Sequence, residues 1–432
     1  MQMTKFKNHQ PHGNFKIPIH WKVSRLKHCL NICNGNSISD SKKEKYALND
    51  LESTPYISTK DINVDNSTIS ENDLLYIPKK LVHYFRLAPK ESFLLCIEGG
   101  SAGKKIAFLN FDACFVNKLA SFTANKTNII TKYYYYYFKS QYVKDQFILS
   151  MNGLIGGVSI SQIKNFECFI PTTEEQQKIV KFLDKKSLQI DEAIAKTEKM
   201  IELLKEHRKI TIYNAVTCGI NPNIPLKPSG VHWVGNIPTH WQIKRAKFIF
   251  NEVDERSITG TEELLSVSHL TGVTPRSEKN VSMFMSESYE GSKLCKPGDL
   301  IINIMWAWMG ALGVSDQPGI VSPSYGVYRQ KINDTFNSYY LEELLKSKNY
   351  VDEYNRRSTG LHSSRLRLYS HLFFDMKIGY PGIKEQNKIV EYIQNISQKI
   401  EIAIGYKQNE IEKLKEYKAT LVDNAVTGKI KV

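Results

Sequence analysis

The chain has 432 residues, of which 41% are hydrophobic and 24% are charged, so two to four domains with sizeable cores are expected. No apolar run approaches about 18 residues and the polar, basic start lacks an apolar core, so we expect no membrane span, no signal peptide and a cytoplasmic location. The excess of 58 Lys and Arg over 44 Asp and Glu gives a net charge of +14, which favours a polyanionic partner.

The seven cysteines are scattered singly, apart from Cys29 and Cys33. An odd number without a CxxC pair is typical of reduced thiols in a bacterial-type cytosol. Because no His/Cys cluster has the spacing of zinc ligands, we expect no metal site.

The start of the chain, residues 1–16, is expected to be a loose basic segment. It is followed by Ile17-Pro18-Ile19-His20-Trp21, a string that returns as Ile237-Pro238-Thr239-His240-Trp241. Both tryptophans are expected to anchor a core. The repeated string marks the beginning of two related blocks.

The two blocks, roughly 17–170 and 237–380, share a pattern of short β-type runs, Gly-rich turns and one helical stretch. The pattern predicts mixed α/β (α+β) domains. The expected strands are Phe93–Ile97, Ile106–Asn110, Phe166–Ile170, Leu300–Ile304, Gly319–Ser322 and Phe373–Tyr380, and the expected helices are Tyr133–Tyr142 and Tyr339–Tyr350.

Two aromatic stretches within these blocks could either pack in a core or bind a ligand. The run Tyr133–Tyr137 could stack on bases, but it aligns with Tyr340–Leu344, where leucines face a core, so we favour core packing. Trp306 and Trp308 lie in an apolar run that reads as a strand, and we expect their rings to alternate between its faces.

The segment Pro171–Thr217 occurs twice. It aligns without a gap on Pro381–Thr427, with 19 of 47 positions identical. A repeat of this period is too long for a solenoid and indicates two duplicated halves. The chain therefore reads as a variable block, a helix, a second variable block and a second helix.

Both copies of this segment show apolar residues spaced by three and four, which predicts one long amphipathic helix in each. At about 1.5 Å per residue, 45 residues extend ~65 Å, more than one small domain can cover. We therefore expect the two helices to pair, although each could instead pack on its own domain. The residues expected to pair are Ile190, Ile194, Ile201, Leu204, Ile400, Ile404, Ile411 and Leu414.

Several short motifs suggest chemistry and are rejected. The run Gly99–Lys105 departs from a phosphate-binding loop, because Lys105 stands where Ser or Thr is needed, and a turn fits better. Asn221-Pro222-Asn223-Ile224 lacks the second proline and the aromatic residue of an amino-methyltransferase loop. Pro297-Gly298-Asp299 could begin a nuclease site, but no Glu-x-Lys or Asp-x-Lys motif follows it closely. We therefore interpret it as a turn. No catalytic residues are predicted.

Basic residues are the candidates for DNA contact, since Lys and Arg can neutralise phosphates while Arg and Ser can read base edges. A solvated surface charge remains the alternative at each position. The candidates are Lys79, Lys80, Arg86, Lys104, Lys105 and Lys126 in the first block, and Arg276, Lys279, Arg329, Arg356, Arg357, Ser363, Arg365 and Arg367 in the second.

Three stretches together resemble a known family. The run from Leu226 to Trp241 is similar to the block that opens a recognition domain in specificity subunits of type I restriction-modification enzymes. Pro171 with Glu175–Val180 is similar to that family's helix-opening motif. The ending Ala425–Val432 is similar to its usual end, although Cys218 replaces the glycine found at Gly428.

The resemblance implies two target recognition domains (1–170 and 237–380), two long antiparallel helices (171–220 and 381–432) that form a coiled coil, and a linker (221–236). It implies that each domain reads one half of a split site in double-stranded DNA. It also implies that the helices set the gap and dock two modification (methyltransferase) subunits. No cofactor is expected on this chain: S-adenosylmethionine, ATP and Mg²⁺ would belong to the methyltransferase and restriction (translocase) subunits.

Two other functions stay open at this point. A coiled-coil assembly adaptor with protein-binding domains would show no preference for any duplex. A self-contained methyltransferase or nuclease is disfavoured by the missing motifs.

Overall fold

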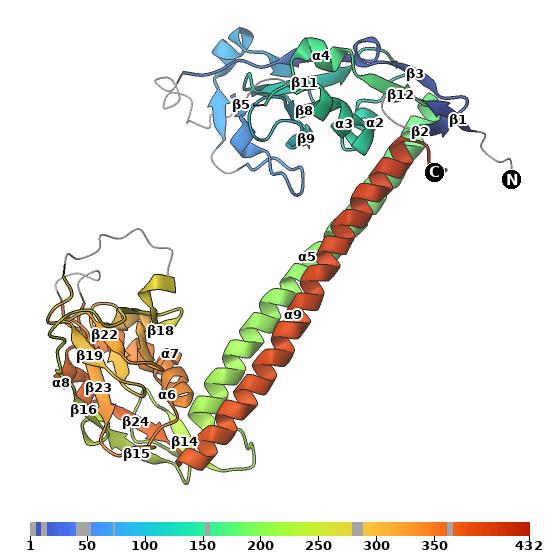
Figure 1. Ribbon diagram of the computed structural model, residues 1–432. Helices are drawn as coiled ribbons and strands as arrows, with labels where there is room; N and C mark the ends of the chain where they lie inside the picture. The colour runs from blue at the N-terminus through green and yellow to red at the C-terminus, as the bar shows by residue number, and fades with distance from the viewer. Residues whose placement is uncertain are drawn as a thin grey trace. The chain divides into compact units, whose positions relative to one another are not determined.

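The computed structural model of the chain describes residues 6–9, 15–39, 53–71, 74–151, 156–278, 288–360 and 366–432 (Figure 1). The chain divides into two compact units. The first unit is Met1–Glu198 with Gln408–Val432, and the second unit is Lys199–Lys407. Among the described residues, no helix combines the length and the apolar character that crossing a membrane requires.

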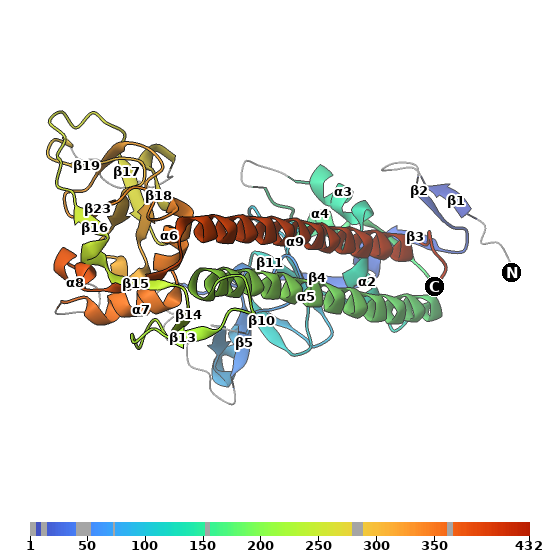
Figure 2. The same cartoon turned by 90° about the horizontal axis from the view of Figure 1, so that it is seen from below.

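Two long helices are shared by the units, because each begins in one and ends in the other. They are α5 (Thr173–Cys218), with 46 residues, and α9 (Ile383–Val426), with 44 residues. The repeated segment therefore forms two long helices, as its apolar spacing predicts. Within each unit the two helices lie side by side (Figures 1 and 2).

The helices run antiparallel, as two ion pairs show. Lys418 Nζ lies 2.7 Å from the Asp191 carboxylate in the first unit. In the second unit, Arg208 Nη1 lies 4.0 Å from Glu401 Oε2. Arg208 follows Asp191 by 17 residues along α5, and Glu401 precedes Lys418 by the same 17 residues along α9. One register thus describes the pairing in both units.

The residues predicted to pair occupy the inner face of these helices. Ile190, Ile201, Ile400 and Ile404 are buried, with at most 9% of their surface exposed. The remaining members, Ile194, Leu204, Ile411 and Leu414, are half-buried. Their neighbours in sequence are mostly exposed charged residues, so the pattern is that of a two-helix seam.

The first unit is a mixed α/β domain built around a four-stranded antiparallel sheet of order β4-β11-β8-β9, with a second four-stranded sheet of order β6-β5-β10-β7. Its strands are β1 (Phe6–His9), β2 (Phe15–Pro18), β3 (Lys22–Arg25), β4 (Leu30–Asn34), β5 (Thr54–Ile57), β6 (Leu75–Ile77), β7 (Leu87–Ala88), β8 (Phe93–Cys96), β9 (Ile106–Phe108), β10 (Ala113–Phe115), β11 (Leu119–Ala124) and β12 (Glu167–Ile170). Its short helices are α2 (Thr131–Tyr137), α3 (Gln141–Leu149) and α4 (Ile160–Lys164).

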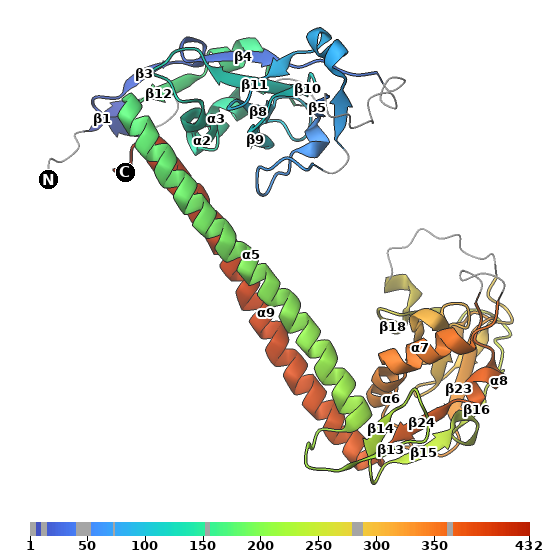
Figure 3. The same ribbon diagram turned by 180° about the vertical axis from the view of Figure 1, so that it is seen from behind.

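The second unit contains an equivalent antiparallel sheet of order β16-β23-β20-β21, and α6 contacts α7 and β21 (Figure 3). Its strands are β13 (Leu226–Pro228), β14 (Asn236–Pro238), β15 (Gln242–Arg245), β16 (Phe250–Glu252), β17 (Leu265–Ser268), β18 (Gly272–Pro275), β19 (Lys293–Cys295), β20 (Leu300–Ile302), β21 (Leu312–Val314), β22 (Gly319–Val321), β23 (Gly326–Gln330) and β24 (Lys377–Tyr380). Its short helices are α6 (Ser338–Leu345), α7 (Lys348–Arg357) and α8 (Ser370–Phe374).

Several predictions about these elements are corrected. The basic start is not entirely loose, because β1 pairs antiparallel with β2. The segment 221–236, whose Pro and Gly content allows a linker or an ordered turn, is the ordered turn, since β13 pairs with β14 and Trp233 packs edge-on against Tyr350. Each single predicted helix within a block is two helices, α2 with α3 and α6 with α7. Ser140 caps the start of α3 by accepting from Val143 N–H, whereas Ser347 precedes α7 without a side-chain cap.

The predicted core residues are confirmed. All five tyrosines of Tyr133–Tyr137 are buried, as are Trp21 and Trp241. The core of the first unit also takes in Val422, Ala425 and Val426 from the end of α9. The core of the second unit takes in Ala215 and Val216 from the end of α5. Each domain therefore packs against the start of one long helix and the end of the other.

The place where these segments meet, which we call the helix junction, is built twice. In the first unit Glu175, near the start of α5, lies 2.8 Å from His20 Nε2 and accepts a hydrogen bond from Trp21 Nε1 at 3.4 Å. In the second unit Glu385 lies 2.7 Å from His240 Nε2 and accepts from Trp241 Nε1 at 3.1 Å. The repeated His-Trp string thus holds the repeated glutamate.

The N-terminus of α5 carries a capping box, in which Glu175 accepts from the Thr172 backbone N–H at 3.0 Å and Thr172 Oγ1 accepts from the Glu175 N–H at 3.3 Å. Burial by itself would raise the pKa of Glu175, but hydrogen bonds from His20 and Thr172 outweigh it and hold that pKa below its usual value. Gly382 takes the place of Thr172 before α9, and there the cap is backbone only.

Candidate nucleic-acid interface

Each central sheet ends in a loop at the same topological position. The loop between β8 and β9, residues 97–105, is here called the glycine loop, and the loop between β20 and β21, residues 303–311, the tryptophan loop. A backbone hydrogen bond joins each to the segment before the last small helix: Val158 N–H donates to Ile97 O at 2.9 Å, and Leu368 N–H donates to Ile304 O at 3.0 Å. The two loops are therefore structural equivalents.

The glycine loop is a tight turn, as its composition predicts. Gly99 and Gly103 have positive φ angles of 85° and 73°, where a side chain would be strained. Lys104 is exposed. The Lys105 ammonium is instead tied to the domain, because Nζ donates to Thr59 O at 2.6 Å. This loop offers backbone groups and the exposed Lys104 side chain, whose Nζ donates to Gly100 O at 3.4 Å, and it has no phosphate-binding motif.

The tryptophan loop has a different chemistry. Trp306 is 49% exposed, and its ring stacks on that of Trp308 with centroids 5.9 Å apart and an interplanar angle of 23°. The prediction that the two rings alternate across a strand is wrong, because Ala307–Met309 form a 3-10 turn that ends at Gly310 in the left-handed conformation. The turn brings both rings to one side.

Polar and basic side chains lie near this loop. Asn303 Nδ2 donates to Tyr325 Oη at 3.1 Å. Burial raises the pKa of the Tyr325 phenol, and the positive charge of nearby Arg276 opposes that rise. Arg367 is exposed on a segment whose backbone pairs with Thr359. The end of the second sheet thus combines an exposed indole with two arginines from the predicted set.

The other candidates in the first unit do not gather at the glycine loop. Lys79 and Lys80 are exposed on a 3-10 helix, Lys79–Tyr84, and Arg86 is exposed beyond it. Lys126 follows β11, whose first residue, Leu119, pairs with Cys96 at the loop end of β8. Because β11 runs away from that end, Lys126 lies at the opposite end of the sheet from Lys104.

Three arginine candidates of the second unit are engaged in ion pairs. Arg329 donates to both oxygens of buried Asp299 at 2.8 and 2.7 Å and to Glu255 at 2.8 Å, and the hydrogen bonds to Asp299 raise the pKa of the Arg329 guanidinium. Arg356 and Arg357, at the end of α7, both pair with buried Glu353. Burial opposes ionisation of Glu353, but the two arginines outweigh it and lower its pKa. Lys279, Ser363 and Arg365 lie outside the described residues.

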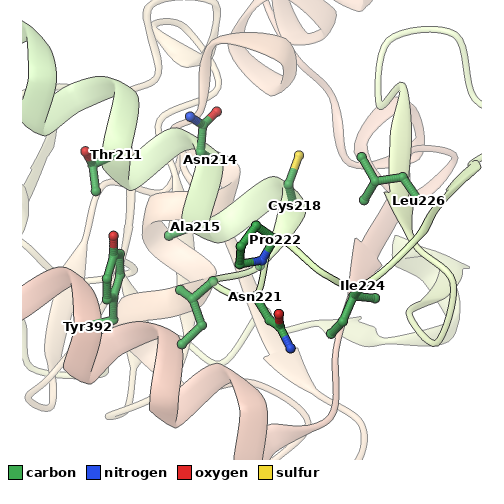
Figure 4. A pocket seen from close by; sticks show the side chains of 11 residues that line it. Thr211, Asn214, Ala215, Cys218, Asn221, Pro222, Ile224, Leu226 and Tyr392 are labelled. Atoms are coloured by element: carbon green, nitrogen blue, oxygen red, sulfur yellow. The ribbon is translucent and has the colours of Figure 1, made fainter.

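A pocket of about 280 Å³ lies in the second unit where α5 ends (Figure 4). Thr211 and Tyr392 line it from the two long helices, together with Cys218 and Asn221. The Asn221 side chain accepts a hydrogen bond from the Asn223 backbone at 3.0 Å, so the Asn-Pro motif forms a local turn. No carboxylate, histidine, lysine or arginine lines this pocket, which offers no acid–base pair for catalysis.

Within the described part of the chain, no group of three or more His, Cys, Asp or Glu side chains is placed to hold a metal ion. The geometry that stands out is instead the repetition of the helix junction in two domains whose sheet-end loops have unlike chemistry.

Comparison with known proteins gives a match for part of the chain. Residues 18–203 match the model of the type I restriction modification DNA specificity domain. The Type I restriction enzyme StySPI specificity subunit of Salmonella potsdam is 24% identical to the chain over 227 residues. That match covers 50% of the chain and 47% of the relative, so it spans about half the length of the relative.

Solved structures share the fold of the chain. The crystal structure of the HsdS subunit from Thermoanaerobacter tengcongensis aligns with a TM-score of 0.53 at 16% identity, covering 97% of this chain and 100% of that one. A chain from a study of complex assembly and conformational transition of the type I R-M system aligns with a TM-score of 0.61 at 14% identity, covering 96% and 100%. The fold of two mixed domains and long helices is thus shared with both solved chains.

Three residues at the loop end of the second domain are not among the basic candidates predicted from the sequence. They are Trp306, Asn303 and Tyr325, none of which carries a charge. One signal was present: Met305–Gly310 puts two tryptophans and two methionines in six residues that also end in glycine. A six-residue run with four large side chains is too long to be buried within a short strand, so it indicates an exposed turn.

Proposed function

We propose that the chain is a non-catalytic, sequence-specific DNA-recognition subunit of a type I restriction-modification complex. Each domain reads one half of a split site in double-stranded DNA. The helices α5 and α9 set the gap between the halves and dock the methyltransferase subunits.

The observation that carries this proposal is the contrast within the repeat. The helix junction is built from the same residues and the same hydrogen bonds in both units, which suits binding of two identical partner subunits. The glycine and tryptophan loops occupy equivalent positions with unlike side chains, which suits recognition of two different DNA sequences. A duplicated scaffold with divergent loops is what a reader of a two-part site requires.

The net charge of +14 supports binding to a duplex. Lysine and arginine side chains that neutralise phosphates release counterions, so affinity would fall steeply as salt rises. Phosphate contacts would position each domain, while loop side chains in a groove would choose the sequence. A chain that reads DNA in this way acts in the cytoplasm of a bacterial cell.

The chemistry belongs to partner subunits in this proposal. Two modification subunits bring S-adenosylmethionine for methyl transfer, and restriction subunits add translocation and cleavage that depend on ATP and Mg²⁺.

Exchange of residues 237–380 for the corresponding block of another specificity protein tests the proposal. With methyltransferase subunits supplied, the sites methylated in genomic DNA should change in one half-site and stay the same in the other. Exchange of residues 17–170 is the reciprocal control and should change the other half. If either exchange altered both halves or neither, the modular function would be refuted.

A further inference from the structure

Trp306 is an exposed aromatic side chain that stacks on Trp308 and is not among the core residues of the second unit. About half of its surface is open, whereas Trp21 and Trp241 are buried in cores. Met309, three residues further along the same loop, is also exposed. Exposed large apolar side chains gathered on one loop mark a contact surface more often than scattered ones do.

The loop holds this ring in a fixed position. Trp306 N–H donates to Asn303 O at 3.0 Å, and Ala311 N–H donates to Trp306 O at 3.2 Å. The supporting ring of Trp308 is held in turn, because its Nε1 donates to Met305 O at 3.0 Å. An aromatic anchor that is ordered before binding loses little conformational entropy when it meets a partner.

The kind of partner follows from comparison with the first unit. A protein subunit that binds both halves of a duplicated scaffold needs the same chemistry on each. The equivalent glycine loop has no aromatic residue and carries Lys104 and Lys105 instead. The tryptophan loop therefore serves a partner that differs between the two domains, and the two half-sites of a split DNA sequence differ in this way.

The charges around the loop also fit DNA. The Tyr325 phenol, which accepts a hydrogen bond from Asn303 of the loop, feels the positive charge of Arg276. Arg367 is exposed and precedes Leu368, whose N–H donates to Ile304 O of the loop at 3.0 Å. Guanidinium groups near an apolar ring would meet phosphates, while the ring would meet the apolar part of a base in the groove.

We propose that Trp306 is a specificity-determining residue of the second domain, which packs its indole against the bases of one half-site, with Arg276 and Arg367 on the flanking phosphates. This inference rests on the proposed function. It adds a residue that reads bases and assigns it to one half-site.

The test uses the full chain assembled with methyltransferase subunits and duplexes that carry the intact site, a changed first half-site or a changed second half-site. Trp306→Ala should weaken binding to the intact site on the order of tenfold, the loss typical of removing one aromatic–base contact. It should also reduce discrimination at the second half-site and leave discrimination at the first unchanged. Trp306→Phe should retain most of the affinity.

Ile332→Ala provides the matched control, because Ile332 is 71% exposed in the same unit and follows β23 at the end opposite the tryptophan loop. It should bind every duplex like the wild type. Equal weakening on intact and altered duplexes by Trp306→Ala, or no change at all, would overturn the inference. Loss of methyltransferase binding without a change in duplex choice would overturn it too and make the loop a protein-docking surface. A wild type without any duplex preference would instead refute the proposed function.

Discussion

The two helix junctions are built alike, whereas the two loops at the ends of the sheets differ in their side chains. Gln176 is fully buried in the first junction, accepts from Ile130 N–H at 2.9 Å and donates to Asn128 O and Pro171 O. Gln386 in the second junction accepts from Asn337 N–H at 2.9 Å and donates to Thr335 O and Pro381 O. These are the same three bonds, made by the same side chain, in two domains whose loops share only a backbone path.

In each unit a tyrosine also binds the C-terminal end of the other long helix. Tyr133 Oη donates to Val426 O at 3.0 Å, and Tyr340 Oη donates to Val216 O at 3.0 Å. A buried polar network allows few substitutions, because every donor and acceptor in it needs its partner. A loop that faces solvent carries no such constraint. Equivalent residues therefore stay alike at the junctions and differ at the loops.

The largest expected effect comes from the junction glutamines. Gln176→Leu leaves one N–H and two carbonyl groups buried without this partner, which should lower the free energy of unfolding by about 2–4 kcal/mol. Gln386→Leu should cost a similar amount, since its bonds are the same. Urea unfolding followed by hydrogen exchange in α5 and α9 measures both, with exposed Gln177→Leu as the control. Very unequal losses would show that the two junctions are not energetic equivalents.

The next largest effect is expected at Arg329, which we expect to stabilise the second unit and not to contact DNA. Asp299 is 1% exposed and directly precedes β20. The residue that directly precedes the equivalent strand β8 is Ser92, which carries no charge. Arg329→Gln should leave the Asp299 carboxylate without its main partner and destabilise the second unit by about 2–3 kcal/mol. The salt dependence of duplex binding should not change. Thermal unfolding and a salt titration measure the two, with exposed Arg367→Gln as the control. A shallower salt slope with unchanged stability would identify Arg329 as a phosphate contact instead.

A smaller, asymmetric effect is expected at the glycines that follow the long helices. The φ angles of Gly219 and Gly428 are 79° and 74°, so alanine at either position should cost about 1–2 kcal/mol. A Cβ on Gly428 would also lie 2.5 Å from Pro18 Cδ, whereas the nearest atom to one on Gly219 is 3.5 Å away. Gly428→Ala should therefore lower the melting temperature more than Gly219→Ala. Equal shifts would mean that Pro18 moves aside freely.

The smallest effect concerns a lysine that differs between the units. Lys139 Nζ donates to Tyr135 Oη at 2.7 Å, while its equivalent, Lys346, pairs with Glu342 at 2.7 Å. Burial, with a further contribution from the charge of Lys418, lowers the pKa of Lys139 to about 7; Asp191 opposes this and Lys144 adds to it. Because the unfolded chain then binds more protons above pH 7, this group makes stability rise with pH from about 7 to 10.

Lys139→Met should remove that rise and raise the melting temperature slightly at pH 7. Lys346→Met is the matched control and should lower it, because an ion pair is lost. Differential scanning calorimetry at pH 7, 8 and 9 makes the comparison. If both variants shifted stability in the same direction at pH 7, the environments of the two lysines would not differ as the structure shows.

Much of the fold was predictable from the sequence because its causes are local or repeated. Apolar spacing over Ile190–Leu204 and Ile400–Leu414 predicts helices that pair along one face, and the self-match of the chain predicts two similar halves. The tyrosine run was assigned to the core by alignment with leucines, and burial of Tyr133–Tyr137 confirms it. Cys218 stands at the position of Gly428 in the repeat, and the positive-φ glycine after α5 comes one residue later, at Gly219.

The candidate site was harder to predict because its determinants are remote in sequence. Residue type alone could not separate Arg329, which is held by Asp299, from Arg367, which is exposed. Periodicity could not separate a strand from the 3-10 turn that brings Trp306 and Trp308 together, since six residues fit both.

By itself, the sequence determined the duplicated plan of this protein, its two long helices and the face on which they pair, because helix periodicity and internal identity need no knowledge of distant contacts. Only the tertiary structure decided which glutamine, glutamate and tyrosine join each domain to the helices, and which loop presents an aromatic ring to solvent. His20 meets Glu175 across 155 positions of sequence, and a hydrogen bond over that distance exists only once the chain has folded.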